Sequence, residues 1–395
     1  MQINQLSGRA MNRKNFEQNP KLLPPKKDEP ALHCAARLGN HDRIRQLINE
    51  GNDINLLFDM ALDPGGREAM ATPLMVAAGS GYGASVETMR LLLDLGADPT
   101  LKYKWGSIGR FATAGLGWNY LPGGDAARLR LCLELGCDPN ETDRRGVTLV
   151  ADAASTGDVE RVRVLLDAGA SPNGDRTIVP SSFEPTPNSP FDDTAPYSFR
   201  IPLHSAVEAD DIESVRLLLA AGADLHALDH GGQTALFGAR STEVVQVLTD
   251  AGLNIEAHDF LGWSPLLAAV MDGSLEGVKA LLSVGADVNA THDRGFTVFM
   301  SAVGAMERNL EIINTLLEAG ADPHAITELG WNAFHAAVDV GGAEASSEES
   351  VRSTLGRLKE LGVNINHKNA QGITPIEMAW GIEVDVLFEL GAKRL

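Results

Sequence analysis

A glycine-rich segment, residues 79–84, is the first candidate for chemistry in this sequence. It reads Gly-Ser-Gly-Tyr-Gly-Ala and satisfies the Gly-x-Gly-x-x-Ala pattern that cradles the pyrophosphate of a dinucleotide in some proteins. That chemistry requires a preceding parallel β-strand, so that the following helix directs its N-terminus at the phosphates. The preceding run, Thr-Pro-Leu-Met-Val-Ala-Ala at residues 72–78, predicts a helix instead. We therefore expect no nucleotide site there.

The histidines and cysteines are the second candidates, because both residue types bind metals. Five of the ten histidines fall in loops between predicted helices, and no chelating spacing recurs among them. These are His226, His230, His258, His292 and His324. Cys132 and Cys137 lack a second pair at zinc-site spacing, and three cysteines cannot form a disulfide framework. We therefore expect no metal, no cofactor and reduced thiols.

Common enzyme motifs are also missing from the sequence. It has no Gly-x-x-x-x-Gly-Lys-Ser/Thr loop for phosphate, no His-Glu-x-x-His pair for zinc and no Gly-x-Ser-x-Gly elbow for acyl transfer. We therefore expect the chain not to be an enzyme. An enzyme built from its inserted segments is a remote alternative.

The elements that would position any site follow a period marked by glycine. Ten times, an apolar run that predicts a helix ends at a glycine, usually followed by Asp, Asn or Pro. Glycine suits this place because it tolerates the left-handed backbone that ends a helix. The ten are Gly51, Gly96, Gly136, Gly169, Gly222, Gly252, Gly285, Gly320, Gly362 and Gly391.

Most of these repeats open with a second phrase of the type Thr-Pro-Leu-x-x-Ala. Examples lie at residues 72–78, 201–206, 264–269, 332–337 and 374–379. Thr before Pro favours a helix start, because the hydroxyl caps free amides and proline fixes a helical φ at the first position. A second helix follows, as at residues 159–166, where Val and Leu at spacings of three, six and seven form one apolar stripe.

Together the two phrases resemble the ankyrin repeat, which has a period of about 33 residues and a Thr-Pro-Leu-His-x-Ala signature. The resemblance covers about ten repeats, from Pro30 to the C-terminus. It implies an all-α solenoid of helix–turn–helix repeats with short β-hairpin or finger loops, in which each repeat buries the open face of its neighbour. It also implies that His33, His204 and His335, fourth in the opening phrase, hydrogen-bond the neighbouring hairpin.

The repeat pattern divides the chain into four segments. They are a basic polar arm at residues 1–29, repeats 1–4 at residues 30–173, a proline-rich finger at residues 174–200, and repeats 5–10 with a C-terminal capping repeat at residues 201–395. Extra residues at 79–83 and 341–346 lengthen two loops between paired helices. Repeat 3 keeps its second helix but loses the opening phrase, so we expect its first helix to be distorted.

The resemblance implies a protein-binding surface made of hairpin tips and the exposed face of the first helices. Three successive repeats place an aromatic residue, Trp263, Phe296 and Trp331, just before the capping position. Aromatic residues are only 5% of the chain, and interface anchors are enriched in Trp and Arg. The alternative is that these rings pack along the hairpins within the molecule. The candidate protein-binding residues are Arg144, Arg145, His230, Phe260, Leu261, Trp263, Arg294, Phe296, Glu328, Leu329 and Trp331.

Charge limits the class of partner. The chain has 33 Lys and Arg against 53 Asp and Glu, a net charge of −20, and such a surface repels phosphates and anionic lipids. No stretch approaches the length of a membrane span, and the first thirty residues lack the apolar core of a signal peptide. We expect a cytoplasmic monomer that binds one or more proteins, basic surfaces included, and neither nucleic acid nor membrane.

The function that we expect is a non-enzymatic protein–protein interaction module. The alternative is an acidic inhibitor of the immunity or antitoxin type, which captures a basic enzyme by charge. A salt series separates the two, because charge capture weakens steeply with ionic strength and an apolar anchor patch does not.

Overall fold

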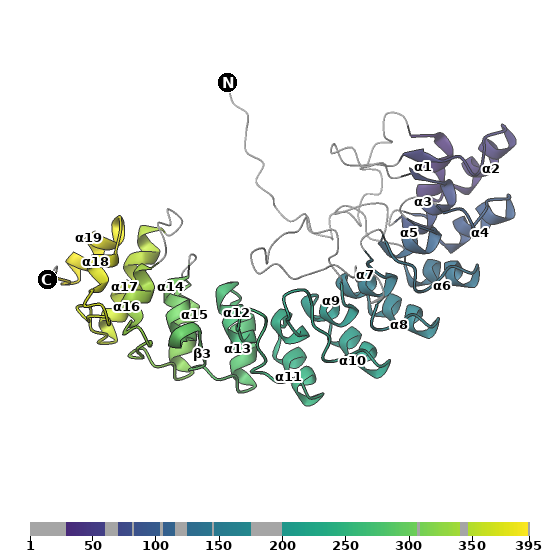
Figure 1. Ribbon diagram of the computed structural model, residues 1–395. Coiled ribbons are helices and arrows are strands. Elements are labelled where there is room, and N and C mark those ends of the chain that lie inside the picture. Colours follow the sequence, from purple (N-terminus) through teal and green to yellow (C-terminus); the bar gives the residue numbers. More distant parts are fainter. Residues whose placement is uncertain are drawn as a thin grey trace, which may run out of the picture. The chain divides into compact units, whose positions relative to one another are not determined.

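The computed structural model describes residues 29–59, 70–80, 83–102, 106–114, 125–143, 146–174, 200–305, 309–339 and 347–393 (Figure 1). Nearly all of the basic arm and of the proline-rich finger, and the loop insertion at residues 341–346, lie outside these ranges. The described elements are helices with short two-residue strands, which confirms the predicted all-α fold of helix–turn–helix repeats.

The chain divides into two compact parts. The N-terminal unit comprises residues 1–153 and 160–171, and the C-terminal unit comprises residues 154–159 and 172–395. Helices wholly within the N-terminal unit are α1 (Ala31–Arg37), α2 (His41–Asn49), α3 (Pro73–Gly79), α4 (Val86–Asp94), α5 (Ile108–Ala114) and α6 (Ala126–Glu134). Most of α7 (Leu149–Ser155) and α8 (Val159–Asp167) also belongs to it.

The C-terminal unit holds the remaining helices. They are α9 (Pro202–Glu208), α10 (Ile212–Ala220), the 3₁₀ helix η3 (Ala235–Gly238), α11 (Thr242–Asp250), α12 (Pro265–Met271), α13 (Leu275–Ser283), α14 (Val298–Gly304), α15 (Leu310–Glu318), α16 (Ala333–Val338), α17 (Glu348–Glu360), α18 (Pro375–Met378) and α19 (Ile382–Glu389).

Two antiparallel hairpins carry the described strands. In the N-terminal unit β1 (Phe58–Asp59) pairs with β2 (Met70–Ala71). In the C-terminal unit β3 (Thr291–His292) and β4 (Phe296–Thr297) pair across the short 3₁₀ turn η4 (Asp293–Gly295). The second hairpin places His292 opposite Phe296, and both residues line a pocket.

The opening phrases start helices as predicted. The hydroxyl of Thr72 accepts a hydrogen bond from the backbone N–H of Met75 at 3.3 Å, and Ser264 and Thr297 do the same for α12 and α14. Proline occupies the first turn of α3, α9, α12 and α18. These interactions are local, so the sequence near these helices predicts where they begin.

The closing glycines end the second helices. After α13, Gly285 adopts φ +100°, and the N–H groups of Gly285 and Ala286 donate to the carbonyls of Leu282 and Leu281, both at 3.1 Å. This is the Schellman arrangement, in which a left-handed residue lets the chain turn back and satisfy the last carbonyls. The chain is thereby redirected toward the next hairpin after every second helix.

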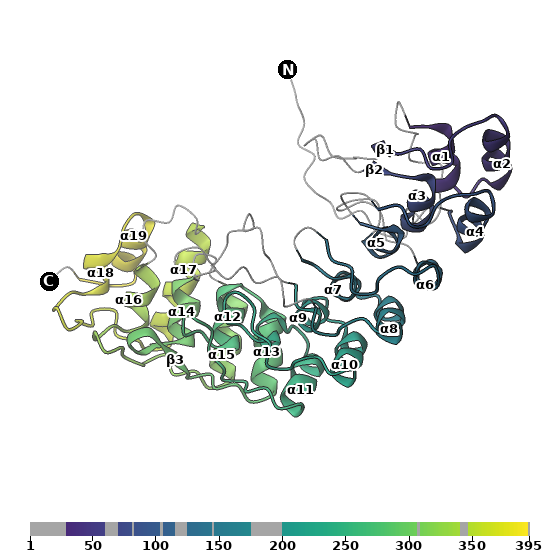
Figure 2. The same ribbon diagram turned by 45° about the vertical axis from the view of Figure 1, so that its right-hand side comes forward.

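Successive repeats of the C-terminal unit pack side by side (Figure 2). The first helices form one row, in which α12 contacts α14 and α14 contacts α16, and the second helices form another, in which α13 contacts α15. Leu266, Phe299 and Phe334 of the first row are almost completely buried. The core is therefore a continuous layer between neighbouring repeats, as expected of a solenoid.

The first helix of repeat 3 corrects one expectation. The missing opening phrase suggested a distorted helix, yet α5 is an α-helix of seven residues, as long as α3. Glu141, from the following loop, accepts hydrogen bonds from the backbone N–H of Ser107 at 2.9 Å and from its hydroxyl. The Ser107 hydroxyl in turn accepts from the N–H of Gly109 at 3.1 Å. Ser107 therefore caps α5 in place of the missing opening phrase, and Glu141 holds that serine from the following loop.

A different repeat departs from the pattern. Repeat 6 spans 18 residues from Thr234 to Gly252, three fewer than the 21 from Ser264 to Gly285. Its first helix is reduced to the single 3₁₀ turn η3, while α11 keeps nine residues.

Among the helices described, none has the length and apolar character needed to cross a membrane.

Candidate functional site

Three consecutive hairpins of the C-terminal unit hold the aromatic row, which we define as Trp263, Phe296 and Trp331. Each ring is half-buried and comes just before the residue that caps α12, α14 or α16. The loop before Trp263 is fixed by Asp259, whose carboxylate accepts the backbone N–H groups of Leu261 and Trp263, both at 2.9 Å. These hydrogen bonds hold the backbone from which the Trp263 side chain extends.

Two members of the row touch other rings. Phe296 meets Trp331 edge-on with centroids 5.6 Å apart, and Trp331 stacks on His335 at 6.0 Å. His292 lies 5.9 Å from Phe296 on the other side. Intramolecular packing therefore accounts for part of the surface of Phe296 and Trp331, while each ring also keeps an exposed part.

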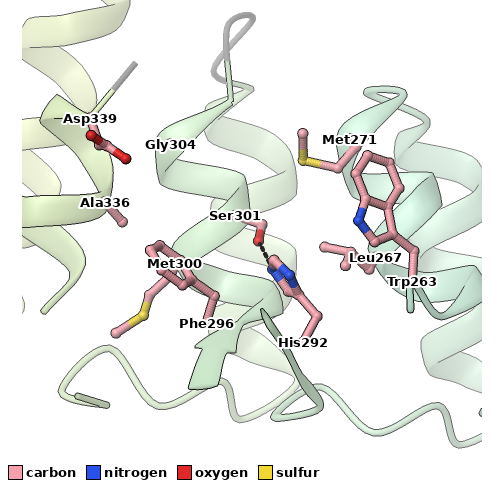
Figure 3. Close-up of a pocket in the computed structure, with 10 residues that line it drawn as sticks. All are labelled: Trp263, Leu267, Met271, His292, Phe296, Met300, Ser301, Gly304, Ala336 and Asp339. Atoms are coloured by element: carbon pink, nitrogen blue, oxygen red, sulfur yellow. Dashed lines mark hydrogen bonds between the residues drawn. The ribbon is translucent and has the colours of Figure 1, made fainter. Parts of the chain in front are cut away.

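Trp263 stands across a pocket from Phe296 (Figure 3). The pocket holds about 180 Å³ and crosses three repeats, because α12, α14 and α16 all contribute to it. Its walls are mostly apolar, with one carboxylate at the α16 side. The lining residues are Trp263, Leu267, Met271, His292, Phe296, Met300, Ser301, Gly304, Ala336 and Asp339.

Close helix packing shapes one side of this pocket. A Cβ atom added to Gly304 would lie 2.8 Å from the carbonyl oxygen of Ala336, which is closer than real Cβ contacts. Glycine at this place therefore lets α14 approach α16. At the outer edge Met271 is 41% exposed, so its flexible thioether is available to a ligand.

His292 and Ser301 form a hydrogen bond at the base of the pocket. Nε2 of His292 and Oγ of Ser301 are 2.7 Å apart, and Ser301 Oγ donates to the carbonyl of Thr297 at 3.3 Å. This places the Nε2 proton on the histidine. Burial lowers the pKa of His292, and the charge of Asp293 opposes this shift.

The same two residue types form the nucleophile and the base of some hydrolases, in which the histidine activates the serine hydroxyl. Base catalysis requires His292 to accept the hydroxyl proton, with a third group holding the other ring nitrogen. Here the Ser301 proton points to Thr297, and Nδ1 of His292 is buried without a hydrogen-bond partner among the described residues. The geometry is that of a structural hydrogen bond and does not activate Ser301.

Asp339 provides the charge in the pocket. It follows the last residue of α16, and the residue as a whole is exposed. Partial desolvation of its carboxyl group raises its pKa. Among the described residues that line the pocket there is no Lys or Arg. The pocket therefore combines apolar walls with a negative edge.

The other predicted site residues that the structure describes outside the aromatic row lie on the hairpin tips and are not among the pocket's lining residues. Phe260 and Leu261 are 66% and 46% exposed, His230, Arg294 and Glu328 are exposed, and Leu329 is half-buried. Arg144 and Arg145 lie outside the described residues.

Backbone hydrogen bonds join neighbouring tips. The N–H of Phe260 donates to Gly231, the N–H of Glu328 to Arg294, and the N–H of Ala370 to Leu329, at 3.0, 3.0 and 2.9 Å. The bonds thus join the tips in two groups, those before η3 and α12 and those before α14, α16 and α18.

Sequence reasoning missed most of the pocket, although a signal was present. Counted from the capping residue, the lining positions of the first helices fall at plus three, plus four and plus seven, as for Leu267 and Met271 after Ser264. Those positions share one helix face. Reading that face across three repeats would have assembled Met271, Gly304 and Asp339.

A second pocket lies over the shortened repeat 6. It holds about 810 Å³ between α9, η3 and α12, and its rim carries both signs of charge, including Glu208, Arg240 and Asp272. Burial raises the pKa of Asp272, and Arg240 opposes that shift. Its mixed lining favours no one class of ligand.

Two other sequence interpretations can be compared with the structure. The repeat histidines behave as the resemblance implied: Nε2 of His33, His204 and His335 lies 3.0, 3.0 and 3.1 Å from the carbonyls of Ala71, Ala227 and Ile373. Residues 73–79, which precede the dinucleotide-like glycines, form helix α3 as predicted.

Family comparisons agree with this architecture. The family model described as ankyrin repeats (3 copies) matches residues 6–103 and 203–292, and the model described as ankyrin repeat matches residues 294–328. The putative ankyrin repeat protein YahD of Escherichia coli (strain K12) is 30% identical over 184 residues, which cover 44% of this chain and 81% of YahD.

Another relative is much longer. The E3 ubiquitin-protein ligase KEG of Arabidopsis thaliana is 27% identical over 311 residues, 70% of this chain, and the chain spans only 18% of the length of KEG. Among solved structures, the ankyrin repeat domain of Bcl-3 is 27% identical, with 60% of this chain and 97% of that domain covered and a TM-score of 0.43. Because the family models match more than half of its residues, this chain belongs to the ankyrin repeat family.

Proposed function

We propose that this protein is a non-enzymatic binding module that holds a partner protein against the first helices and hairpin tips of the C-terminal unit. The observation that carries the proposal is the pocket between Trp263 and Phe296, where three repeats combine to expose aromatic and thioether surface. Interface anchors are typically aromatic or apolar side chains set in such pockets. Membership of a family of interaction repeats supports the same class of function.

The size of the pocket favours a protein partner over a small molecule. Pockets for small ligands usually hold about 300 to 1,000 Å³, whereas this one holds about 180 Å³. A pocket of that size suits one apolar side chain of a larger partner. The hairpin tips on both sides of it offer the additional area that a protein interface needs.

The charges near the pocket indicate which residues of the partner should surround its apolar anchor side chain. Asp339 lines the pocket, and Asp293 and Glu328 are exposed on the adjoining hairpins. With a net charge of −20 over the chain, a partner with basic residues next to its apolar anchor associates faster and more selectively than an acidic one.

A quantitative pull-down from native lysate tests the proposal with a matched pair of variants. Met271→Glu places a charge in the pocket from a side chain that is already 41% exposed. Leu310→Glu is the control: it places the same charge at the start of α15, on a residue that is 37% exposed and is not among those lining the pocket. We expect Met271→Glu to lose the partner at least tenfold and Leu310→Glu to retain it. Equal retention by both variants would reject the pocket as the anchor.

A salt series on the recovered complex then distinguishes anchoring from capture by charge. Binding through the apolar pocket should weaken only a few-fold between 50 and 500 mM NaCl, because screening acts on charges. A loss of several orders of magnitude, together with an intact Met271→Glu complex, would instead favour the acidic inhibitor.

A further inference from the structure

The two cysteines of repeat 3 stand four residues before and one residue after its closing glycine, Gly136. No other repeat has cysteine at either of these two positions. Cys132 is the third residue from the end of α6, and Cys137 follows the closing glycine. In most other repeats the first place holds Leu and the second Ala, as at Leu281 and Ala286. Both apolar residues have been replaced by thiols within one turn.

The turn brings the two side chains together. The N–H of Cys137 donates to the carbonyl of Cys132 at 3.1 Å, and the N–H of Gly136 donates to Leu133 at 3.0 Å. In this Schellman turn the residues at the two cysteine positions normally make an apolar side-chain contact. Here the thiols share a hydrogen bond with one another, and both cysteines are unbonded covalently.

The surroundings distinguish the two sulfurs. Cys132 is fully buried, whereas Cys137 is partly exposed beside the start of α5. The backbone of Gly109 lies beside Cys137, since a Cβ atom added to Gly109 would be 3.1 Å from the Cβ and 3.5 Å from the Sγ of Cys137. A partly exposed cysteine backed by a buried thiol is the arrangement of a reactive cysteine with a resolving partner.

We propose that Cys137 and Cys132 form a peroxide-sensitive thiol pair that closes to a disulfide across the C-terminal turn of α6. In the first step the Cys137 thiolate attacks hydrogen peroxide, so that an S–O bond forms, the O–O bond breaks and hydroxide leaves. In the second step the Cys132 sulfur attacks Cys137, the S–S bond forms and the S–O bond breaks. The released hydroxides take the two thiol protons, so two thiols and one peroxide give one disulfide and two waters.

The electrostatics agree with this assignment. The hydrogen bond from Cys132, with smaller contributions from Ser107 and Gly109, lowers the pKa of Cys137 to about 7, although burial and the Glu141 carboxylate oppose the shift. The pKa of Cys132 is raised by its hydrogen bond to Cys137 and by burial, against the opposing charge of Arg128. The attacking sulfur is thus the exposed one, and the buried thiol keeps its proton until the second step.

Cys34 supplies a control within the same chain. It is half-buried like Cys137, but burial and the charge of Glu29 raise its pKa. At pH 7 iodoacetamide should therefore alkylate Cys137 about tenfold faster than Cys34, since the larger thiolate fraction outweighs the lower intrinsic nucleophilicity of a more acidic thiol. Equal rates at the two sites would overturn the proposal.

Mass spectrometry of the full-length protein tests the disulfide itself. Trypsin releases both cysteines in one peptide, residues 131–144, because Arg130 and Arg144 flank them. After treatment with hydrogen peroxide this peptide should lose two hydrogen atoms and regain them with reductant, while Cys34 stays alkylatable. A peptide that remains reduced, or a Cys137 that ends as sulfinic acid beside a free Cys132, would overturn the pairing.

Two variants assign the roles of the sulfurs. In Cys132→Ala the peptide cannot close, so dimedone should trap Cys137 as sulfenic acid, and the midpoint of the pH–alkylation profile of Cys137 should rise. In Cys137→Ser the buried Cys132 should resist both peroxide and iodoacetamide. Reaction of Cys132 at the rate of wild-type Cys137 would reverse the assignment.

Discussion

The side chain of Asn289 links two consecutive repeats. Its Oδ1 accepts a hydrogen bond from the backbone N–H of Asp322 at 2.9 Å, and its Nδ2 donates to the carbonyl of Gly320 at 3.2 Å. Asn140 and Asn173 each make the same pair of contacts with the loop of the repeat that follows them. In repeat 6 Glu256 takes this place and accepts a hydrogen bond from the backbone N–H of Asp287. A residue in one loop therefore orients the loop that follows α15 in the next repeat.

Removing this link should weaken the coupling between repeats 7 and 8. We expect Asn289→Ala to lower the free energy of unfolding of the C-terminal unit by about 1 to 2 kcal/mol, the sum of two partly exposed hydrogen bonds. Asn289→Asp keeps the acceptor, as Glu256 does, and should cost about half as much. Urea unfolding followed by circular dichroism measures both, and unchanged midpoints would show that the link adds no stability.

Two glycines should respond to alanine with opposite signs. Gly304→Ala forces a Cβ to within 2.8 Å of the Ala336 carbonyl and should destabilise the protein by about 1 to 3 kcal/mol, because α14 must move away from α16. Gly356→Ala lies within α17 with no atom in its way and should stabilise by about 0.5 to 1 kcal/mol. Thermal unfolding of the two variants measures the difference, and a shift in the same direction for both would contradict the packing argument.

Acid should destabilise the fold through buried histidines. Burial lowers the pKa of His33, His292 and His335. The unfolded chain then binds protons more readily than the folded one as the pH falls below about 6.5, so stability is present above that pH and is lost below it. Between pH 7 and 5.5 each group contributes at most about 1.4 kcal/mol per pH unit.

Variants isolate the contribution of one ring. His335→Gln should flatten the dependence of unfolding free energy on pH, while lowering stability at pH 7 through loss of the bond to the Ile373 carbonyl. His226→Gln, at an exposed position, should leave the slope as in wild type. Identical slopes for all three proteins would show that His335 does not carry the effect.

The sequence predicted those parts of the structure that depend on neighbours along the chain. Thr72 caps α3, and Gly285 ends the turn after α13, through atoms a few residues away. The start of α5 could be read only in part, because Ser107 caps it locally but is itself held by Glu141, which lies 34 residues further along the chain. Nor did any local signal single out Gly304, whose importance depends on the carbonyl of Ala336 in the next repeat.

The candidate site shows the same division between local and tertiary information. The position of Trp263 before a capping residue was predictable, and its backbone is held by Asp259 only four residues away. The pocket beside it depends on how α12, α14 and α16 stack, so Met271 and Asp339 were missed although both lie seven residues after a capping residue. Aligning the repeats by capping residue would convert that stacking into a readable pattern.

The two tryptophans of the aromatic row should separate packing from binding. Trp331 loses ring contacts with Phe296 and His335 when truncated, whereas no ring contact involves Trp263 among the described residues. We expect Trp331→Ala to lower the free energy of unfolding by about 2 to 3 kcal/mol, less than the 3 to 5 kcal/mol of a fully buried Trp. Trp263→Ala should cost less than about 1 kcal/mol of stability and at least 2 kcal/mol of partner binding, as for an interface hot spot.

Trp380 gives this comparison its reference, because it is 77% exposed and lies between α18 and α19, away from the row in sequence. Trp380→Ala should change neither unfolding nor the binding of a partner recovered through the Met271 pocket. Thermal unfolding and binding measured on the three variants decide the roles independently. If Trp263→Ala destabilises as much as Trp331→Ala and binding per folded molecule stays intact, then Trp263 is packing as well, and the anchor must lie elsewhere on the tips.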